Sequence, residues 1–420
     1  MSGGAVDSAG VAAQWDFETG SFRFHRATPA GEGGVAVFEL YGKGAAAAIQ
    51  AIFRPRCGRL PEEGRTRVGD LLDLTGECVD EAVVACVPAG ALWSGMEAWT
   101  LSVHGGYWIQ TMVGELLRSI GGVEASLRDV LELSMERGVL DAPRAAAYEF
   151  LVDARTERAA RFFLRQYQGE LSEGLREAMA LVDGGRVDLV VELIASLLGA
   201  SRQALRLGHP LRLLIAGRPN AGKSTLFNRL AEEERSVVTA VPGTTRDLLE
   251  AQIALEDYPV IVADSAGIRP FDSVGPVERQ GILMVSPTAF DGVLYLIPCP
   301  WEWMREDREF LDLVPAAHRL VIASLADLDS GSARRPQADA LISARTGEGL
   351  DAMRRTIVAR WIDDRERPFD ELPCAVFTPE LVKILSEVVP TAGGAAANLD
   401  VVRVALVESL NSSWPVHQVT

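Results

Sequence analysis

The sequence predicts an α/β domain with a phosphate-binding loop, inserted in an all-helical domain and preceded by a small α+β domain. Three observations lead to this fold class. An apolar run of strand length, Leu211–Ala216, enters the segment GRPNAGKS and is followed by a stretch with the composition of a helix. Residues 126–207 are rich in Ala, Leu, Arg and Glu, and their apolar positions recur at intervals of three and four. Residues 28–122 instead alternate short strand-like runs with turns.

The N-terminal α+β domain is predicted to span residues 1–122, and its first 25 residues are expected to form a loose lead-in. His104, between a predicted strand and a predicted helix, is expected to be a cap or a packed core residue rather than a ligand. The other elements are predicted strands at Gly33–Leu40, Glu81–Val87 and Ala98–Val103, and predicted helices at Ala45–Phe53 and Tyr107–Ile120.

Residues 123–210 are predicted to be the first part of the helical domain. The charged segment Arg155–Leu171 is predicted to be one amphipathic helix. Its arginines are interleaved with glutamates, which favours a solvated helix face over an RNA contact. The pair Gly184-Gly185 interrupts the helical pattern, and a helix is expected again at Val190–Leu207.

Residues 363–420 are predicted to complete the helical domain. Two helix-length patterns, Pro379–Val389 and Asn398–Leu410, are separated by the sequence Pro390-Thr-Ala-Gly-Gly. The second pattern carries an apolar stripe whose exposure to water would be unfavourable, so we expect the chain to pack back on the helices at 126–207. The domain at 211–362 is then an insertion. The expected stripe comprises Val401, Val402, Val404, Ala405, Leu406 and Leu410.

Composition narrows the class of protein. The chain has 41 Lys and Arg against 58 Asp and Glu, a net charge of −17, which argues against a general nucleic-acid coat. Its five cysteines form no CxxC pair, so they indicate reduced thiols rather than a zinc site or a disulfide framework. The N-terminus lacks signal-peptide features, and no apolar run reaches the roughly 18 residues that a membrane span needs. We therefore expect a cytoplasmic protein without membrane contact.

The segment from Gly217 to Ser224 matches the pattern GxxxxGK[ST] in the strand–loop–helix context that a phosphate-binding loop requires. Backbone N–H groups must turn towards phosphate oxygens, so side chains are excluded at Gly217 and Gly222, and the helix N-terminus adds partial positive charge. Lys223 is expected to reach the β- and γ-phosphates, and Ser224 to hold Mg²⁺. The predicted phosphate-side residues here are Gly217, Asn220, Ala221, Gly222, Lys223, Ser224 and Thr225.

Two further motifs follow this loop in the order expected of a nucleotide-dependent switch. In PGTTRD, Thr244 and Thr245 are placed to close over the γ-phosphate, and Thr245 to complete the Mg²⁺ shell. A buried strand then ends in DSAG, where Asp264 is expected beside Mg²⁺ and the Gly267 N–H beside the γ-phosphate. The three elements together indicate a nucleotide site.

The base side departs from the Asn-Lys-x-Asp pattern of GTPases, because the corresponding residues are Ser324-Leu325-Ala326-Asp327. Asp327 remains, and its carboxylate can accept from both the N1–H and the exocyclic amine of guanine. The missing Asn and Lys are expected to weaken affinity and to reduce discrimination between bases. The segment ISARTGEG fits the loop that supports guanine, with predicted contacts at Ser343, Ala344 and Arg345.

The motifs GRPNAGKST, VVTAVPGTTRDLLE, DSAGIR and ISARTGEGLDAMR together resemble those of MnmE (also called TrmE), a family of tRNA-modification GTPases. Segments outside the nucleotide domain, among them GGVAV, SGME and VHGG, extend the resemblance over residues 28–362. The resemblance implies a P-loop GTPase domain inserted in an all-helical domain and preceded by an α+β folate-binding-like domain that dimerises.

The resemblance also implies how GTP is hydrolysed. The family acts as a homodimer with Mg²⁺, and a potassium ion takes the place of an arginine finger. Asn220 corresponds to a residue that holds this ion, and Glu278, in the matching context VERQG, to the glutamate that orients the attacking water. The predicted catalytic residues are thus Lys223, Asn220 and Glu278. With a FAD-dependent partner of the MnmG type, the family installs a carboxymethylaminomethyl-type group on the wobble uridine of certain tRNAs.

Two departures bear on the modification chemistry. The sequence ends in NSSWPVHQVT where the family has a cysteine, so the cysteine-dependent step is expected to be absent. Leu133, Arg137 and Val139 replace a family Arg, Asn and Lys, which argues against the folate binding that the resemblance implies. Three hypotheses follow: a divergent GTPase of tRNA modification, a GTP-binding regulatory or scaffold paralogue without that chemistry, and an ATP-preferring P-loop NTPase. Asp327 argues against the third.

Overall fold

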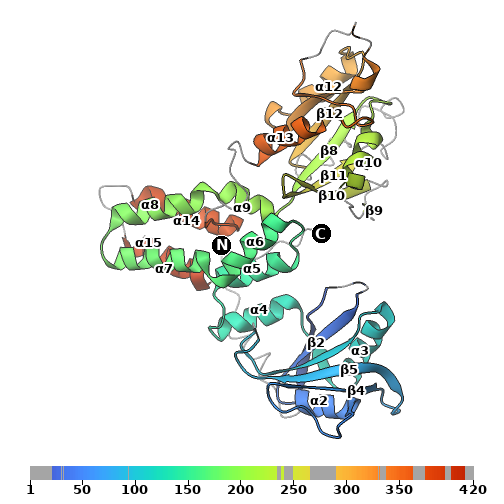
Figure 1. The fold of residues 1–420 in the computed structure, drawn as a ribbon. Helices are drawn as coiled ribbons and strands as arrows, with labels where there is room; N and C mark the ends of the chain where they lie inside the picture. The colour runs from blue at the N-terminus through green and yellow to red at the C-terminus, as the bar shows by residue number, and fades with distance from the viewer. Residues whose placement is uncertain are drawn as a thin grey trace, which may run out of the picture. The chain divides into compact units, whose positions relative to one another are not determined.

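The computed structural model describes residues 21–29, 31, 33–92, 94–233, 238–240, 249–264, 290–329, 331, 337–362, 374–392 and 399–411. These residues belong to two compact units, and each is described by itself. The first unit spans Met1–Val152, Tyr167–Leu175 and Leu406–Thr420, and the second spans Asp153–Gln166 and Arg176–Ala405. A seven-stranded sheet lies in each unit (Figure 1). The finer domain boundaries expected from the sequence stay predictions.

The sheet of the first unit has the strand order β3-β4-β5-β6-β2-β1-β7. β1 and β7 run parallel, and the other neighbouring strands are antiparallel. The predicted strands and helices of this α+β part are confirmed, with small shifts at their ends. The bounds are β1 (Phe22–Arg26), β2 (Val35–Tyr41), α2 (Ala45–Ile52), β3 (Phe53–Pro55), β4 (Arg65–Leu72), β5 (Cys78–Val87), β6 (Ala98–His104), α3 (Tyr107–Ser119) and β7 (Gly122–Glu124).

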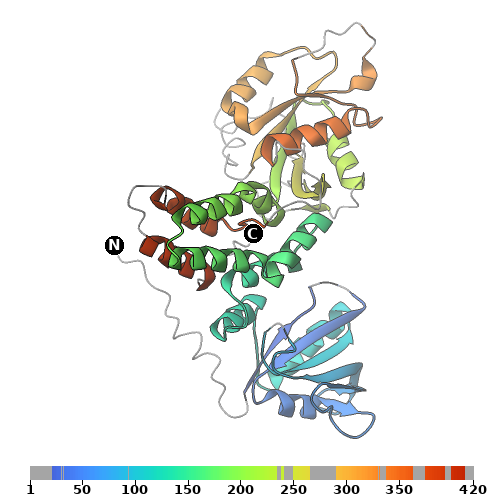
Figure 2. The same ribbon diagram turned by 60° about the vertical axis from the view of Figure 1, so that its left-hand side comes forward.

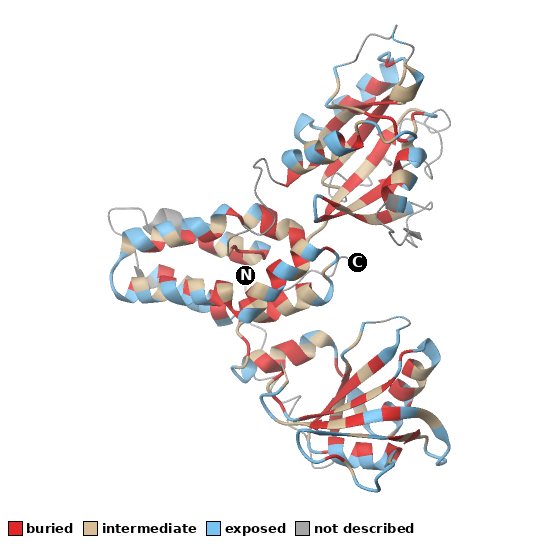
Figure 3. Ribbon diagram, viewed as in Figure 1, coloured by how far each residue is buried: buried red, intermediate tan, exposed pale blue. Residues whose placement is uncertain are grey.

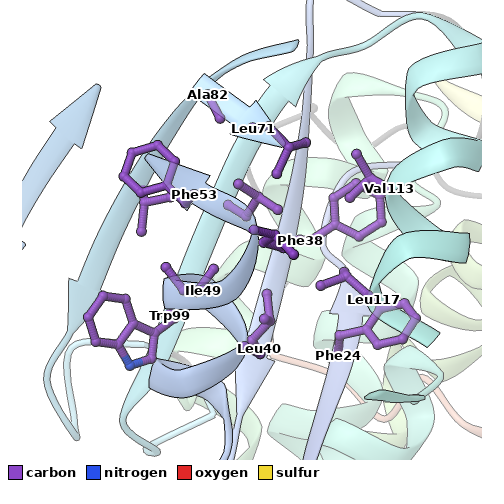
Figure 4. Packing of buried hydrophobic residues seen from close by; sticks show 14 of the residues in the cluster. Phe24, Phe38, Leu40, Ile49, Phe53, Leu71, Ala82, Trp99, Val113 and Leu117 are labelled. Atoms are coloured by element: carbon purple, nitrogen blue, oxygen red, sulfur yellow. The ribbon is translucent and has the colours of Figure 1, made fainter. Parts of the chain in front are cut away.

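The core of this α+β part lies between one face of the sheet and the helices α2 and α3. Phe24 and Leu40 are fully buried there, with Ile49 from α2 and Leu117 from α3 (Figure 4). Strand β1 was not expected, because the first 25 residues carry little repeating pattern. Phe22 and Phe24 alternate with more exposed neighbours and fill this core, so the lead-in prediction is wrong for residues 22–25.

His104 differs from its prediction as a cap or a packed core residue. Its side chain is 69% exposed, and its Nδ1 lies 2.6 Å from Asp80 Oδ1. Its backbone N–H donates to Asp80 Oδ2 at 2.8 Å. The hydrogen bond to Asp80, and then the carboxylate charge, raise the pKa of His104. The residue ends β6 as an exposed partner of Asp80 instead of filling the core.

A carboxyl group lies buried on strand β2. Glu39 is 5% exposed, and the Tyr41 hydroxyl donates to its Oε2. Burial raises the pKa of Glu39, and the hydrogen bond from Tyr41 opposes this effect in part. The native state therefore binds the Glu39 proton more tightly than the unfolded chain does. As pH rises from the unfolded pKa through the folded pKa, this group lowers the free energy of unfolding.

Glu39→Gln is expected to raise the stability of the first unit more at pH 7 than at pH 4. Glutamine does not titrate, and its amide oxygen can still accept from Tyr41. Scanning calorimetry at both pH values measures the effect, with the exposed Glu97→Gln as a matched control. An equal stability change at the two pH values would show that burial of the ionised Glu39 carboxylate does not lower the free energy of unfolding.

Residues 130–141, which depart from the sequence of the family that the chain resembles, begin in helix α4 (Leu127–Glu136). Ser126 caps this helix by accepting from the Asp129 N–H, and the Asp129 carboxylate accepts from the Ser126 N–H in return. Leu133 is 3% exposed, so an apolar residue suits this position. Arg137 forms the exposed C-cap. Helix α5 (Ala142–Val152) follows and packs against α4.

The charged segment at 155–171 forms two helices rather than the one that was predicted. α6 (Glu157–Gln168) ends before Gly169, and α7 (Glu170–Asp183) begins after it. Gly169 has φ +111, a conformation that interrupts a right-handed helix. The second expected helix is also divided, into α8 (Val187–Gly199) and α9 (Ser201–Gly208) on either side of Ala200.

Within the second unit, the chain returns to these helices after the α/β domain. The Val376 N–H donates to the Leu197 carbonyl oxygen at 3.1 Å, and Phe377 packs edge-on against Phe162 and Phe163 of α6. α14 (Pro379–Ala392) then lies beside α8 (Figure 2). The helix continues past Pro390, so the predicted end at Val389 is wrong.

The last described helix is α15 (Leu399–Asn411). Val402 and Leu406 are 0% exposed and Leu410 is 9% exposed, a spacing of four that places them on one face. Val401 and Val404 are 47% and 65% exposed, so the predicted stripe was too wide. Among the described residues, no helix combines the length and the apolar composition that crossing a membrane requires.

The sheet of the second unit has the strand order β14-β13-β12-β8-β11-β10-β9. Strands β14 to β11 run parallel, and β10 and β9 are antiparallel to their neighbours. Figure 3 shows buried residues concentrated along the strands. The bounds are β8 (Leu211–Gly217), α10 (Lys223–Glu233), β9 (Val238–Ala240), β10 (Leu249–Leu255), β11 (Tyr258–Asp264), β12 (Gly292–Pro298), α12 (Arg305–Leu313), β13 (Arg319–Ser324), β14 (Ala340–Leu341) and α13 (Leu350–Trp361).

Candidate nucleotide-binding site

The phosphate-binding loop joins β8 to α10, as the sequence predicts (Figure 1). Gly217 has φ +143, and a Cβ atom there would lie 2.5 Å from the Leu296 carbonyl oxygen, so no larger residue fits. Asn220 and Gly222 also have positive φ values, +61 and +87. Left-handed residues within such a turn aim backbone N–H groups to one side, which is how a loop binds an anion.

Lys223 is half-buried and lies folded over this loop. Its Nζ donates to the carbonyl oxygens of Gly217 at 3.0 Å and of Arg218 at 2.9 Å. Burial lowers the pKa of Lys223, and the Asp264 carboxylate opposes this effect. The two hydrogen bonds keep the ammonium group at the loop, where the sequence predicts contact with phosphates.

Two oxygen donors of the predicted Mg²⁺ site lie at the carboxyl end of the sheet. Asp264, the last residue of β11, is 3% exposed and pairs with Ile215 of β8. Ser224 and Thr225 are exposed in the first turn of α10. A hydroxyl and a carboxylate are hard ligands that suit Mg²⁺, so Ser224 and Asp264 fit this ion. The predicted roles of Thr244, Thr245, Gly267 and Glu278 stay predictions, because these residues lie outside the described ranges.

The base-side residues meet around Asp327, which lies in the short helix η4 (Ala326–Leu328). The Ser343 hydroxyl donates to Oδ1 of Asp327 at 2.6 Å, and the Arg345 guanidinium lies 2.9 Å from Oδ2. The hydrogen bond from Ser343, followed by smaller effects that include Arg345, lowers the pKa of Asp327. The carboxylate is thus charged at neutral pH and can accept two donors. Ala344, which lies between Ser343 and Arg345 in the sequence, is 9% exposed.

A direct hydrogen bond joins the base side to the phosphate side. The Ser324 hydroxyl donates to the Ala221 carbonyl oxygen at 2.8 Å and lies 3.2 Å from the Ile297 carbonyl oxygen. Ser324 is 3% exposed, so this contact is made away from water. It fixes the end of β13 against the phosphate-binding loop.

Comparison with known proteins places this arrangement in a family. A family profile described as "50S ribosome-binding GTPase" matches residues 212–324. The tRNA modification GTPase MnmE of Symbiobacterium thermophilum is 33% identical over 365 residues, which cover 78% of this chain and 79% of that relative. The chain belongs to the MnmE family. The MnmE protein of Bradyrhizobium sp. (strain ORS 278) is 34% identical over 357 residues, covering 77% and 78% of the two chains.

The family assignment confirms the resemblance and favours the first of the three hypotheses. The matches to MnmE extend well beyond the nucleotide domain, since one covers 365 residues and the profile covers only residues 212–324. Neither the regulatory paralogue nor the ATP-preferring NTPase is favoured by them.

In this chain of the MnmE family, the positions of the missing Asn and Lys still contact the phosphate-binding loop. Ser324 makes the hydrogen bond to Ala221, and Leu325, with φ +59, lies against Gly222. A Cβ atom on Gly222 would lie 3.3 Å from Leu325 Cδ2. Neither contact could be predicted from the motif, because a motif specifies residue types. That the Ser324 hydroxyl reaches the loop depends on a distance that only the fold supplies.

Proposed function

We propose that this MnmE-family chain binds Mg²⁺ with GTP or GDP and hydrolyses GTP during tRNA modification. The observation that supports this most is the Ser324–Ala221 hydrogen bond, because it joins the Asp327 loop to the Lys223 loop. β8 and β13 are both parallel to β12, so their carboxyl ends lie at one edge of the sheet, where α/β domains bind ligands.

Different side chains would bind the phosphates and the base. Lys223 and the backbone N–H groups of residues 217–223 would hold the phosphates, and Ser224 and Asp264 would hold Mg²⁺. Asp327 would accept the two N–H donors of guanine. Adenine presents a ring acceptor at the corresponding position, which a carboxylate repels. When bound, Mg²⁺ would supply positive charge to the phosphate groups.

Calorimetric titration of the full chain tests this function. Mg·GDP is expected to bind more tightly than Mg·ADP, and removal of Mg²⁺ with a chelator to weaken the binding of GTP. The affinity is expected to stay below that of GTPases with a complete Asn-Lys-x-Asp motif. Equal affinities for GTP and ATP would refute the guanine assignment.

The family mechanism adds a potassium ion and a homodimer to this proposal. Asn220 is exposed in the phosphate-binding loop and has the left-handed conformation that asparagine tolerates. We expect GTP turnover to be faster in K⁺ than in Na⁺, and this difference to be lost in Asn220→Ala. Steady-state phosphate release measures both, and Asn228→Ala, an exposed asparagine of α10, is the control. Turnover that is indifferent to the cation would reject potassium as part of the mechanism.

Glu278 is proposed to orient the attacking water, on the family motif alone. Glu278→Ala is then expected to lower kcat and to leave the affinity for GTP nearly unchanged, because the residue would act only in the transition state.

The modification step is proposed to use tRNA and a FAD-dependent partner of the MnmG type. The loss of folate binding stays a prediction. Complementation of an MnmE-deficient bacterium tests the modification step. Normal levels of the modified wobble uridine would agree with this proposal, and unmodified uridine in a strain that produces an active GTPase would contradict it.

A further inference from the structure

The segment Cys299–Met304, which connects β12 to α12, contacts the base side of the site. Its residue Trp301 is 3% exposed and packs in an apolar cluster formed by β8, β12, β13 and α12. The indole Nε1–H donates to the Ser324 carbonyl oxygen at 2.9 Å, and the Cys299 N–H donates to the same oxygen at 3.1 Å. Trp301 therefore helps to hold the residue from which the Asp327 loop starts.

The same segment also contacts the phosphate side. Arg218, the second residue of the phosphate-binding loop, donates from its guanidinium to the Glu302 carbonyl oxygen at 2.9 Å. Its Nε lies 3.2 Å from Asp307 Oδ1, and the Asp307 side chain is 0% exposed. Asp307 also accepts from the Tyr295 hydroxyl and from the Met304 N–H, each at 2.8 Å. Arg218 is thus held by a buried carboxylate that is itself fixed by two donors.

We propose that Trp301 is a positioning residue that couples recognition of the base to binding of the phosphates. The inference rests on the GTP-binding function proposed above. Trp301 touches Ser324, whose hydroxyl reaches Ala221 in the loop, and the next residue, Glu302, accepts from Arg218. These contacts close a ring between the two sides of the site. A displacement of the Asp327 loop is transmitted to the phosphate-binding loop through it.

Trp301→Phe removes the indole N–H that donates to the Ser324 carbonyl oxygen. Phenylalanine keeps an aromatic ring in the apolar cluster but fills less of it, so the melting temperature is measured beside the affinities. The Cys299 N–H still bonds to that oxygen, so the Asp327 loop is expected to loosen without detaching. Loss of one hydrogen bond corresponds to a three- to tenfold weaker Kd for Mg·GDP, on the order of what such bonds contribute.

The test compares Mg·GDP with Mg·IDP, whose base lacks the 2-amino group. Calorimetry on the full chain measures both affinities well below the melting temperature of each variant. IDP depends less on Asp327, so Trp301→Phe is expected to weaken GDP binding more than IDP binding. The preference for GDP over IDP then falls. If Trp301 had only a structural role, Trp301→Phe would lower the melting temperature or weaken the binding of GDP and IDP by the same factor.

Two further variants complete the design. Trp303→Phe, in the same segment and 36% exposed, is expected to change neither affinity. Asp307→Asn releases Arg218 on the phosphate side, and because the ring joins the two sides it is expected to lower the preference for GDP over IDP as well. This second variant decides the question if Trp301→Phe lowers the melting temperature below that of the assay, since an unchanged preference for GDP over IDP in Asp307→Asn would overturn the proposal.

The outcomes separate the inference from the function on which it rests. An unchanged GDP affinity, or an equal loss for GDP and IDP, in Trp301→Phe would overturn the coupling role and leave GTP binding intact. If the unsubstituted chain binds GDP no more tightly than ADP, the proposed function fails, and the coupling role fails with it.

Discussion

Asp327→Asn is expected to weaken binding of Mg·GDP by at least about 100-fold and to strengthen binding of the xanthine nucleotide Mg·XDP. Guanine offers two N–H donors, and a carboxylate accepts both. An asparagine amide offers one acceptor and one donor, which matches the N1–H and the C2 carbonyl of xanthine instead. Calorimetric titration with GDP and XDP measures the change of preference.

The contacts of Asp327 explain how the base gains access to it. The Ser343 side chain is 0% exposed and fixed, whereas the Arg345 side chain is 73% exposed and can leave Oδ2 at the small cost of a surface ion pair. Guanine is therefore expected to displace Arg345 and to leave Ser343 in place. Asp329→Asn, two residues further along, is the control and should leave both affinities unchanged. Retention of GDP affinity in Asp327→Asn would place guanine recognition elsewhere.

Phe377→Ala is expected to lower the free energy of unfolding of the second unit by about 3–5 kcal/mol. Phe377 is 1% exposed, and its ring centroid lies 5.6 Å from that of Phe163 and 6.0 Å from that of Phe162. Truncation leaves a cavity between α6 and the returning chain, and it also removes two edge-to-face ring contacts. Urea unfolding followed by circular dichroism measures the loss.

Leu164→Ala is the matched control for this substitution. Leu164 lies on the same helix, α6, and is 44% exposed, so its truncation should change the stability by less than about 0.5 kcal/mol. The affinity for GDP should be unchanged in both variants. Equal destabilisation by the two substitutions would show that the aromatic cluster contributes no more than the helix surface does.

The parts of the fold that the sequence predicts best are those decided by neighbouring residues. Gly217 and Gly222 satisfy a local demand of the loop for positive φ, and the strand and helix on either side have clear periodicity. The pairing of Asp327 with Ser343 could also be expected, because both residues belong to motifs that follow parallel strands.

The errors occur where a distant contact decides. The stripe predicted on α15 is amphipathic in sequence, but the number of positions that a neighbour covers is fixed by packing, as exposed Val401 and Val404 show. His104 is exposed because Asp80, on another strand, binds it at the sheet end. No sequence pattern predicts the contacts of Trp301 and Arg218, since neither residue belongs to a base-recognition motif.

Both sheets end in very short strands. In the first unit the edge strands β3 and β7 have three residues each, and in the second unit β14 has two and β9 has three. An edge this short offers few unpaired backbone groups to a strand from another chain, which disfavours edge-to-edge aggregation. Among the residues that the structure describes, the outermost strands of both sheets are thus only two or three residues long, which limits how far a strand of another chain could pair with them.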